Sequence, residues 1–270
     1  MQEIRSSTHR EQSQNGAHRL PFPIRVAILE GVDTARLCFD GDLIDFSDLL
    51  DDLIDEGDLE AAEARLHEME LLGGGTHPLV RSASIRLRWA REGAASIVDE
   101  LRDLAHQVGD DPDLYHLLGC AYEELDRFHE MVAAFLETLR LDTLADAESL
   151  REFPPLLLDA IEARARAVLD GLPAEIGRRL SRVPVILEER PHPALVKEGF
   201  DPRALGLFEG PNLVELDIPQ PTRIVLYLRN LYDVASSDEE LLEEVEITVL
   251  HEIGHYLGLD ECEVHALGFG

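Results

Sequence analysis

Hydrophobic and polar positions follow two different periods along this chain of 270 residues. From about residue 42 to 145, apolar residues recur at i, i+3 and i+4, which is the spacing of amphipathic helices. Further on, three short apolar or β-branched runs bounded by proline and glycine predict strands; they are SRVPVILEE, LGLFEG and TRIVLYLRN. The pattern therefore predicts an α-helical repeat domain followed by a small α+β domain.

The helical region divides into three helix pairs, with turns inside the pairs at Gly57, Gly93 and Asp126. These turns recur about every 35 residues, which is close to the period of tetratricopeptide repeats. The third pair resembles that repeat most closely, and small residues such as Gly119 would let its helices approach each other. A generic helical bundle is the alternative. The positions that carry the resemblance are Tyr115, Leu118, Gly119, Tyr122, Phe128, Met131 and Phe135.

The expected boundaries are a disordered, polar segment over 1–22, the helical repeats over 23–145 and the second domain over 146–270. A short strand or hairpin is expected over 24–39, and one helix is expected over 146–171. No run of about 18 apolar residues and no signal-peptide pattern is visible, so a cytoplasmic protein without a membrane span is expected. Three widely spaced cysteines fit a reducing compartment.

The charge balance is strongly acidic, with 55 Asp and Glu against 24 Lys and Arg and a formal net charge of −31. Such a polyanion repels nucleic acid and anionic lipid, so neither is expected as a partner. Basic or neutral proteins are favoured instead. The alternative interpretation is that the charge serves solubility alone.

The last predicted helix begins at Ser237, where SDEE forms a capping box with Glu240, and stops at Gly258. Its buried stripe is expected to comprise Leu242, Val245, Val249, Ile253 and Leu257. The helix carries the stretch HEIGHYLGLDE, in which His251 and His255 are four residues apart and so share one face.

Two imidazoles in this arrangement hold one zinc ion at about 2.0–2.1 Å. Glu252 lies beside a ligand and is placed to take the proton of a water that zinc acidifies toward a pKa of about 7. A catalytic zinc needs a third protein ligand and one open position. Gly258 lets the chain turn back, and Glu261 then stands at the right spacing to be that ligand. The competitors are Asp260, Glu263 and His265, while Cys262 is a further thiol beside them.

With these residues, positions from about 150 to 270 resemble the minimal zincin-like bacterial metallopeptidases, whose pattern is HExxHxxGxxD. The resemblance implies a compact α+β zincin fold, with Glu261 standing where that family has its presumed aspartate ligand. A metzincin is excluded because the only methionines are Met1, Met69 and Met131, so no methionine turn exists. A gluzincin is excluded because the 15 residues after His255 leave no room for a separate ligand helix.

The predicted function is that of a zinc metallopeptidase, an endopeptidase whose protein substrate or protein partner is recruited by the helical repeats. His251, His255 and Glu261 would hold Zn²⁺, with Glu252 as general base. Candidates for stabilising the oxyanion are Tyr227, Arg229, Tyr232 and His265, and a structural role is the alternative for each. The rival hypothesis is a non-catalytic adaptor in which the repeats bind a partner and the zinc is a structural brace.

Overall fold

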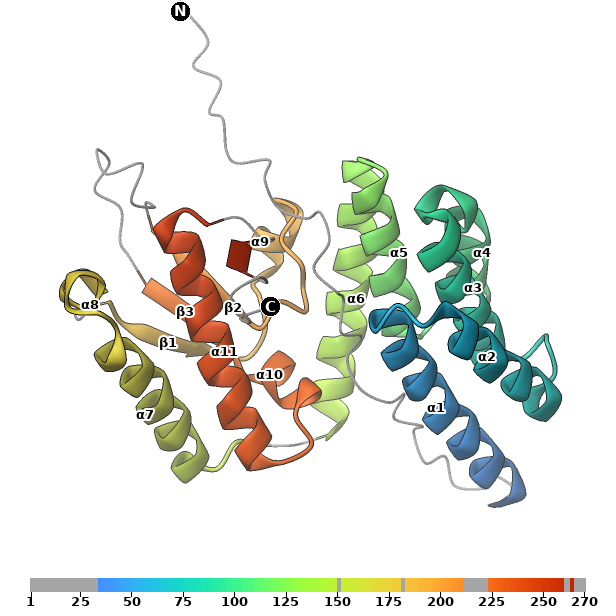
Figure 1. The fold of residues 1–270 in the computed structure, drawn as a ribbon, viewed down its shortest axis with the longest axis horizontal. Coiled ribbons are helices and arrows are strands. Elements are labelled where there is room, and N and C mark those ends of the chain that lie inside the picture. Colours follow the sequence, from blue (N-terminus) through green and yellow to red (C-terminus); the bar gives the residue numbers. More distant parts are fainter. Residues whose placement is uncertain (1–33, 150–151, 181–182, 211–222, 260–262, 265–270) are drawn as a thin grey trace, which may run out of the picture. The chain divides into compact units, whose positions relative to one another are not determined.

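The computed structural model describes residues 34–149, 152–180, 183–210, 223–259 and 263–264, with side chains from residue 43 onward. Contacts divide the chain into two units. The helical unit comprises the described residues up to 149 together with 191–203, and the sheet-containing unit comprises the others. The segment 1–22 lies outside the described residues. Helices followed by a small sheet confirm the predicted fold class (Figure 1).

The helical unit is a succession of helices in which each packs against the next. Its elements are α1 (Thr34–Asp55), α2 (Leu59–Gly73), α3 (Pro78–Glu92), the 3₁₀ turn η1 (Ala94–Ser96), α4 (Val98–Val108), α5 (Pro112–Glu124), α6 (Phe128–Ser149) and the short α9 (Pro193–Lys197). One core lies among α1, α2 and α3 and another among α3, α4, α5 and α6, and the second core also takes in Val196 of α9. No described helix is long and apolar enough to cross a membrane.

The turns inside the three predicted helix pairs share one backbone feature, a positive φ. It is 77° at Gly57, 82° at Gly93 and 56° at Asp126. Glycine and aspartate tolerate this conformation better than most residues do, which explains these residue types at the turns. Between α5 and α6, a Cβ atom added to Gly119 would lie 2.2 Å from ring atoms of Phe135, so the helices approach each other as closely as predicted.

Two expectations about element boundaries are wrong. Residues 34–39 belong to helix α1 and not to a strand or hairpin, while residues 24–33 lie outside the described part. In place of one helix over 146–171, α6 continues to Ser149 and α7 begins at Pro155. A proline favours the first helical position and disfavours a helical conformation in the residue before it, and Pro154 accordingly has an extended ψ of 137°.

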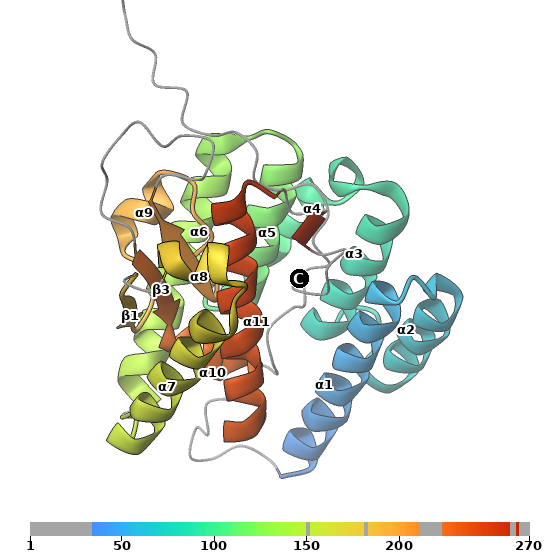
Figure 2. The same cartoon turned by 60° about the vertical axis from the view of Figure 1, so that its left-hand side comes forward.

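The sheet-containing unit has three strands in the order β1-β3-β2, with β1 parallel and β2 antiparallel to β3. All three lie within the predicted runs. Helices α7 and α11 pack against each other and against the sheet, and they bury a shared apolar core (Figure 2). The elements are α7 (Pro155–Gly171), α8 (Ala174–Leu180), β1 (Val185–Glu188), β2 (Gly206–Glu209), β3 (Arg223–Tyr227), α10 (Leu228–Val234) and α11 (Asp238–Leu257).

Helix α11 has the predicted ends. Ser237 Oγ accepts a hydrogen bond from the Glu240 amide at 3.2 Å, and the Glu240 carboxylate accepts one from the Ser236 amide at 2.7 Å. The helix stops at Gly258, whose φ of 87° is left-handed. Three residues of the predicted stripe are fully buried, namely Val245, Val249 and Ile253, but Leu241 lies deeper than Leu242. Buried packing and both caps therefore fix the helix that carries the histidine pair.

Candidate metal centre on the last helix

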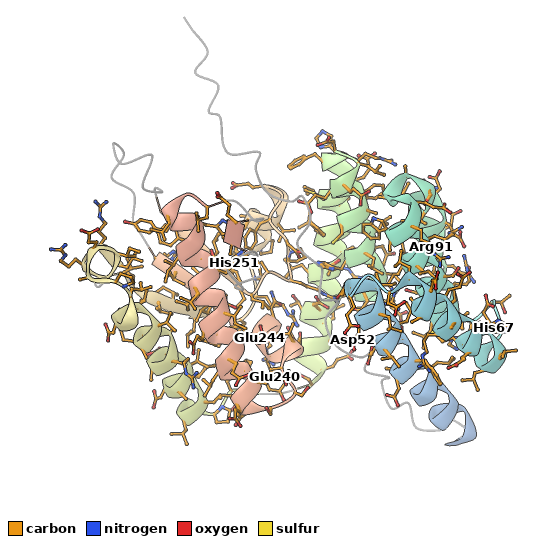
Figure 3. All side chains as sticks on the ribbon, in the orientation of Figure 1. Asp52, His67, Arg91, Glu240, Glu244 and His251 are labelled. Atoms are coloured by element: carbon orange, nitrogen blue, oxygen red, sulfur yellow. The ribbon has the colours of Figure 1, made fainter. Side chains whose placement is uncertain are left out.

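His251 and His255 face each other near the C-terminal end of α11. Their Nε2 atoms are 2.9 Å apart, and their ring centroids are 4.7 Å apart at an interplanar angle of 76°. Both rings are half-buried. His251 follows Glu240 and Glu244 along the helix (Figure 3). The one-turn spacing thus brings two ring nitrogens to a single point, as a shared ligand requires.

The second nitrogen of His255 contacts the backbone. Nδ1 of His255 lies 3.3 Å from the carbonyl oxygen of Leu259, just beyond the helix end. Because a carbonyl can only accept, this contact assigns the proton to Nδ1 and leaves the Nε2 lone pair for a metal. Metal-bound histidines usually make such an outer hydrogen bond, which fixes both the tautomer and the ring orientation.

Glu252, between the two histidines in sequence, is buried with 8% of its surface exposed. Its Oε2 accepts a hydrogen bond of 2.6 Å from the backbone amide of Phe208 in β2. The Tyr227 amide donates to Leu205 O, and in an antiparallel pair every second residue hydrogen-bonds to the neighbouring strand. Leu205, Leu207 and Glu209 therefore face β3, and the N–H of Phe208 points to the outer edge of β2. Glu252 is therefore held at the sheet edge that β3 does not cover.

A glycine in β2 allows this approach. A Cβ atom on Gly206 would lie 2.6 Å from Cγ2 of Thr248 and 3.4 Å from Cγ of Glu252. Helix α11 can therefore contact β2 closely only because residue 206 has no side chain. Neither Gly206 nor the Phe208 amide was predicted from the sequence, although a glycine inside a strand is a known sign of close backbone approach.

A second glycine lies on the histidine face of α11. Gly254 contacts Val264, whose Cγ2 would be 2.7 Å from an added Cβ, and Val264 is fully buried. The Leu259 amide also donates to Gly254 O at 3.1 Å. The described residues on both sides of 260–262 therefore lie against the end of α11 that carries the histidines.

The described donors fit a zinc ion. In a tetrahedral site with bonds of 2.0–2.1 Å, two ligand nitrogens are about 3.3 Å apart, a few tenths more than the 2.9 Å between the Nε2 atoms. The proposed third ligand Glu261 lies outside the described residues, as do Asp260, Cys262 and His265. Glu263 is described and exposed. Of the predicted site, the structure thus brings the two histidine rings together and holds Glu252, which follows His251 in the helix, at the edge of β2.

The described candidates for oxyanion stabilisation belong to the core. Tyr227 is fully buried, and burial together with the charges of Glu188, Glu209 and Glu252 raises the pKa of its hydroxyl far above its ordinary value. The guanidinium of Arg229 lies 4.9 Å from the ring centroid of Phe153, and Tyr232 meets the same ring edge-on at 5.9 Å. These contacts indicate structural roles for all three.

Residues 180–270 match the family model of the zincin-like metallopeptidases. The match begins in α8 and includes all three strands and α11. It supports a zinc metallopeptidase acting on a protein or peptide substrate. A search of curated proteins finds no match to the chain. The zincin-like region thus covers about one third of the chain, and the helices up to α7 lie before it.

Proposed function

We propose that the chain is a zinc-dependent endopeptidase in which His251, His255 and Glu261 bind the metal and Glu252 is the general base. The observation that carries the proposal is the convergence of the two Nε2 atoms to 2.9 Å, on a helix where the residue after His251 is the buried Glu252. When bound there, zinc supplies a Lewis acid and lowers the pKa of a coordinated water to about 7.

The choice of Glu261 as third ligand is supported by the residues that flank it. Leu259 contacts His255 on one side and Val264 packs against Gly254 on the other. Glu261 is two residues after Leu259 and three before Val264, and consecutive Cα atoms are about 3.8 Å apart, so these two contacts favour Glu261 as the ligand. Glu263, the one competitor among the described residues, is exposed.

Glu252 is proposed to take the proton of the attacking water and to pass it to the leaving amine. Its bond to the Phe208 amide restricts the carboxylate to one position, which favours directed proton transfer. The outer edge of β2 offers further backbone groups for an extended peptide, which would add as a strand. Because strand pairing recognises a stretch within a chain, it supports an endopeptidase.

The helical unit is proposed to recruit the substrate or a protein partner as tetratricopeptide-like repeats do. The positive-φ turns and the close contact at Gly119 support this proposal. A cavity of about 180 Å³ in this unit is largely apolar, and its lining includes Ile54, Trp89 and Leu117 beside Asp51 and Asp55. The acidic chain favours basic or unfolded clients, whose binding should weaken as salt rises. Three widely spaced cysteines support a cytoplasmic location.

One observation favours a second candidate, the non-catalytic adaptor with a structural zinc. Glu252 is buried and already accepts a hydrogen bond of 2.6 Å, as a carboxylate in a structural role would. In that case the metal stabilises the zincin-like region and the helical unit carries the function.

The deciding experiment incubates the zinc-loaded full chain with a mixture of denatured proteins and identifies new N-termini by mass spectrometry. The matched controls are Glu252→Gln, which keeps the size of the side chain, and His255→Ala, which removes a ligand. The endopeptidase predicts cleavage by the wild type alone, with zinc retained in Glu252→Gln. Zinc binding without cleavage by the wild type would support the adaptor, and a wild type that binds no metal would refute both.

A further inference from the structure

A second group of metal-binding side chains lies in the helical unit. His116 and Cys120 are one turn apart on α5, and Asp201 comes from the segment after α9. His116 Nε2 is 2.9 and 3.0 Å from the two carboxylate oxygens of Asp201 and 4.0 Å from Cys120 Sγ. One donor atom from each residue lies within 4.8 Å of the others.

The surroundings of this group are those of a built site. His116 and Cys120 are each only 5% exposed, while the Asp201 side chain is 35% exposed. The histidine ring stacks on Phe135 at 5.6 Å, which restricts its rotation. The Asp201 carboxylate is thus open to solvent, which gives a metal ion access to the group, and Cys120 also lines the cavity of about 180 Å³ in the helical unit.

The third donor is held in place by its own segment. Asp201 Oδ1 accepts a 2.7 Å hydrogen bond from the Arg203 amide, and Arg203 makes two bonds to Asp142, at 2.9 and 3.0 Å, and one of 2.7 Å to Asp113. Val196 of α9 is fully buried in the helical core. The carboxylate is therefore fixed before any ligand binds.

We propose that His116, Cys120 and Asp201 form a second metal site, separate from the histidine pair on α11, that binds Zn²⁺ or a similar borderline cation. Imidazole, thiolate and carboxylate are all zinc ligands, with bonds of about 2.0–2.3 Å. Tetrahedral geometry at these lengths needs about 3.3 Å between nitrogen and oxygen and about 3.5 Å between nitrogen and sulfur. The observed 2.9 and 4.0 Å are each about half an ångström from these values.

The second ring nitrogen of His116, Nδ1, indicates how tightly this site binds a metal ion. Nδ1 of His116 is buried and has no hydrogen-bond partner among the described residues. The loss of such an outer bond typically lowers metal affinity about 10- to 100-fold. The site is therefore a labile one that loads when metal is supplied, and it fastens segment 191–203 to α5. Without metal, the same three residues form an imidazole–carboxylate pair next to a thiol.

Cobalt titration of the full chain tests the proposal, because a thiolate ligand gives Co²⁺ a charge-transfer band in the near ultraviolet. The titration uses the His251→Ala, His255→Ala double variant, from which the proposed peptidase site is missing. About one equivalent of Co²⁺ should bind with this band and be displaced by Zn²⁺. Cys120→Ser should abolish the band, whereas Cys262→Ser and Cys38→Ser should keep it.

Two further readouts separate loss of the site from loss of the fold. Asp201→Asn keeps the oxygen that accepts from the Arg203 amide, so it should fold normally by circular dichroism and bind Co²⁺ about tenfold more weakly. Zinc should raise the melting temperature of the double variant but not of its Cys120→Ser derivative. No charge-transfer band, or a band that persists in Cys120→Ser, would overturn the proposal and leave the imidazole–carboxylate pair as the role of these residues.

Discussion

Helices α5 and α11 present the same short arrangement in two different settings. His116, Gly119 and Cys120 on α5 have the spacing of His251, Gly254 and His255 on α11. In each case two side chains of the kinds that bind metals lie one turn apart, with a glycine between them that another side chain contacts closely. On α11 the donors are half-buried and a glutamate lies between them, whereas on α5 the donors are buried.

We infer from this difference that the α11 group suits a catalytic metal and the α5 group a structural one. A catalytic metal needs an open coordination position and a base, and α11 offers half-buried rings and Glu252. In the α5 group the third donor is the carboxylate of Asp201, which lies 85 residues from His116 along the chain. The same helical spacing can therefore suit a catalytic or a structural metal site, depending on the residues around it.

The largest expected effect tests whether α11 is the reactive member. Glu252→Gln should lower cleavage about 10²- to 10⁴-fold, because it removes the proton acceptor but keeps the shape of the side chain and the oxygen facing the Phe208 amide. Cleavage of a reporter protein and zinc content are measured together. Cys120→Ser is the matched control and should cleave as the wild type does. Equal loss in both variants would contradict the division of roles.

The next effect concerns the anchor of the α5 group. Arg203→Ala should destabilise the helical unit by about 3–5 kcal/mol, since it leaves the buried Asp142 without the bidentate bonds from Arg203. Chemical denaturation measures the change. Arg140→Ala breaks an exposed pair with Glu137 and should cost about 0.5 kcal/mol or less. Similar losses in the two variants would show that segment 191–203 is not held through Arg203.

A smaller effect compares the two glycines. Gly119→Ala places a methyl group 2.2 Å from the fully buried ring of Phe135 and should destabilise the helical unit by about 1–3 kcal/mol. Among the described residues, a methyl group added at Gly254 lies closest to Val264, at 2.7 Å, so the main result of Gly254→Ala should be weaker zinc binding, read by competition with a chelator. Gly75→Ala meets no atom within 4 Å and is the neutral control. A stable Gly119→Ala protein would refute the close packing of α5 on α6.

The smallest effect depends on pH and on how the two helices begin. Ser237 caps α11, but α5 is capped by Asp111, whose pKa is raised to about 6 by burial and by the charge of Asp113. Between about pH 4 and 6 the folded state then binds the extra proton, so this group's contribution to stability falls as pH rises through that window. Asp111→Asn keeps the cap oxygen without the charge.

Asp111→Asn should therefore be more stable than the wild type by about 1–2 kcal/mol above pH 7, a figure reduced from the full shift because the site is partly exposed. Below about pH 4 the difference should vanish. Denaturation at several pH values measures it, with the exposed Asp110→Asn as control. A difference that does not change with pH would show that the Asp111 charge carries no cost.

The features that could be predicted from the sequence are those decided by neighbouring residues. The three strands, the Ser237 cap and the Gly258 stop follow from local composition, and all were found as predicted. Residues 34–39 were wrongly assigned to a strand or hairpin because short apolar runs do not distinguish strand from helix. The Phe208 amide that holds Glu252 was missed because strand and helix meet only in the folded unit.

The α5 group could not be predicted from the sequence, for the same reason. His116 and Cys120 looked like isolated residues in the sequence, since their third partner Asp201 comes from a segment between two strands of the other unit. No fixed spacing links residues that only tertiary packing brings together. A local motif therefore predicts the α11 pair, whereas no local motif predicts the α5 group.

The position of segment 191–203 also has a consequence for how the protein is made. A ribosome adds about 5–20 residues per second, so Asp201 emerges several seconds after His116. During that interval the helical unit lacks Val196 in its core and Arg203 beside Asp142. The helical unit, the first to leave the ribosome, is thus completed only after β1 of the other unit has been made, and until then its unfinished face is open to chaperones.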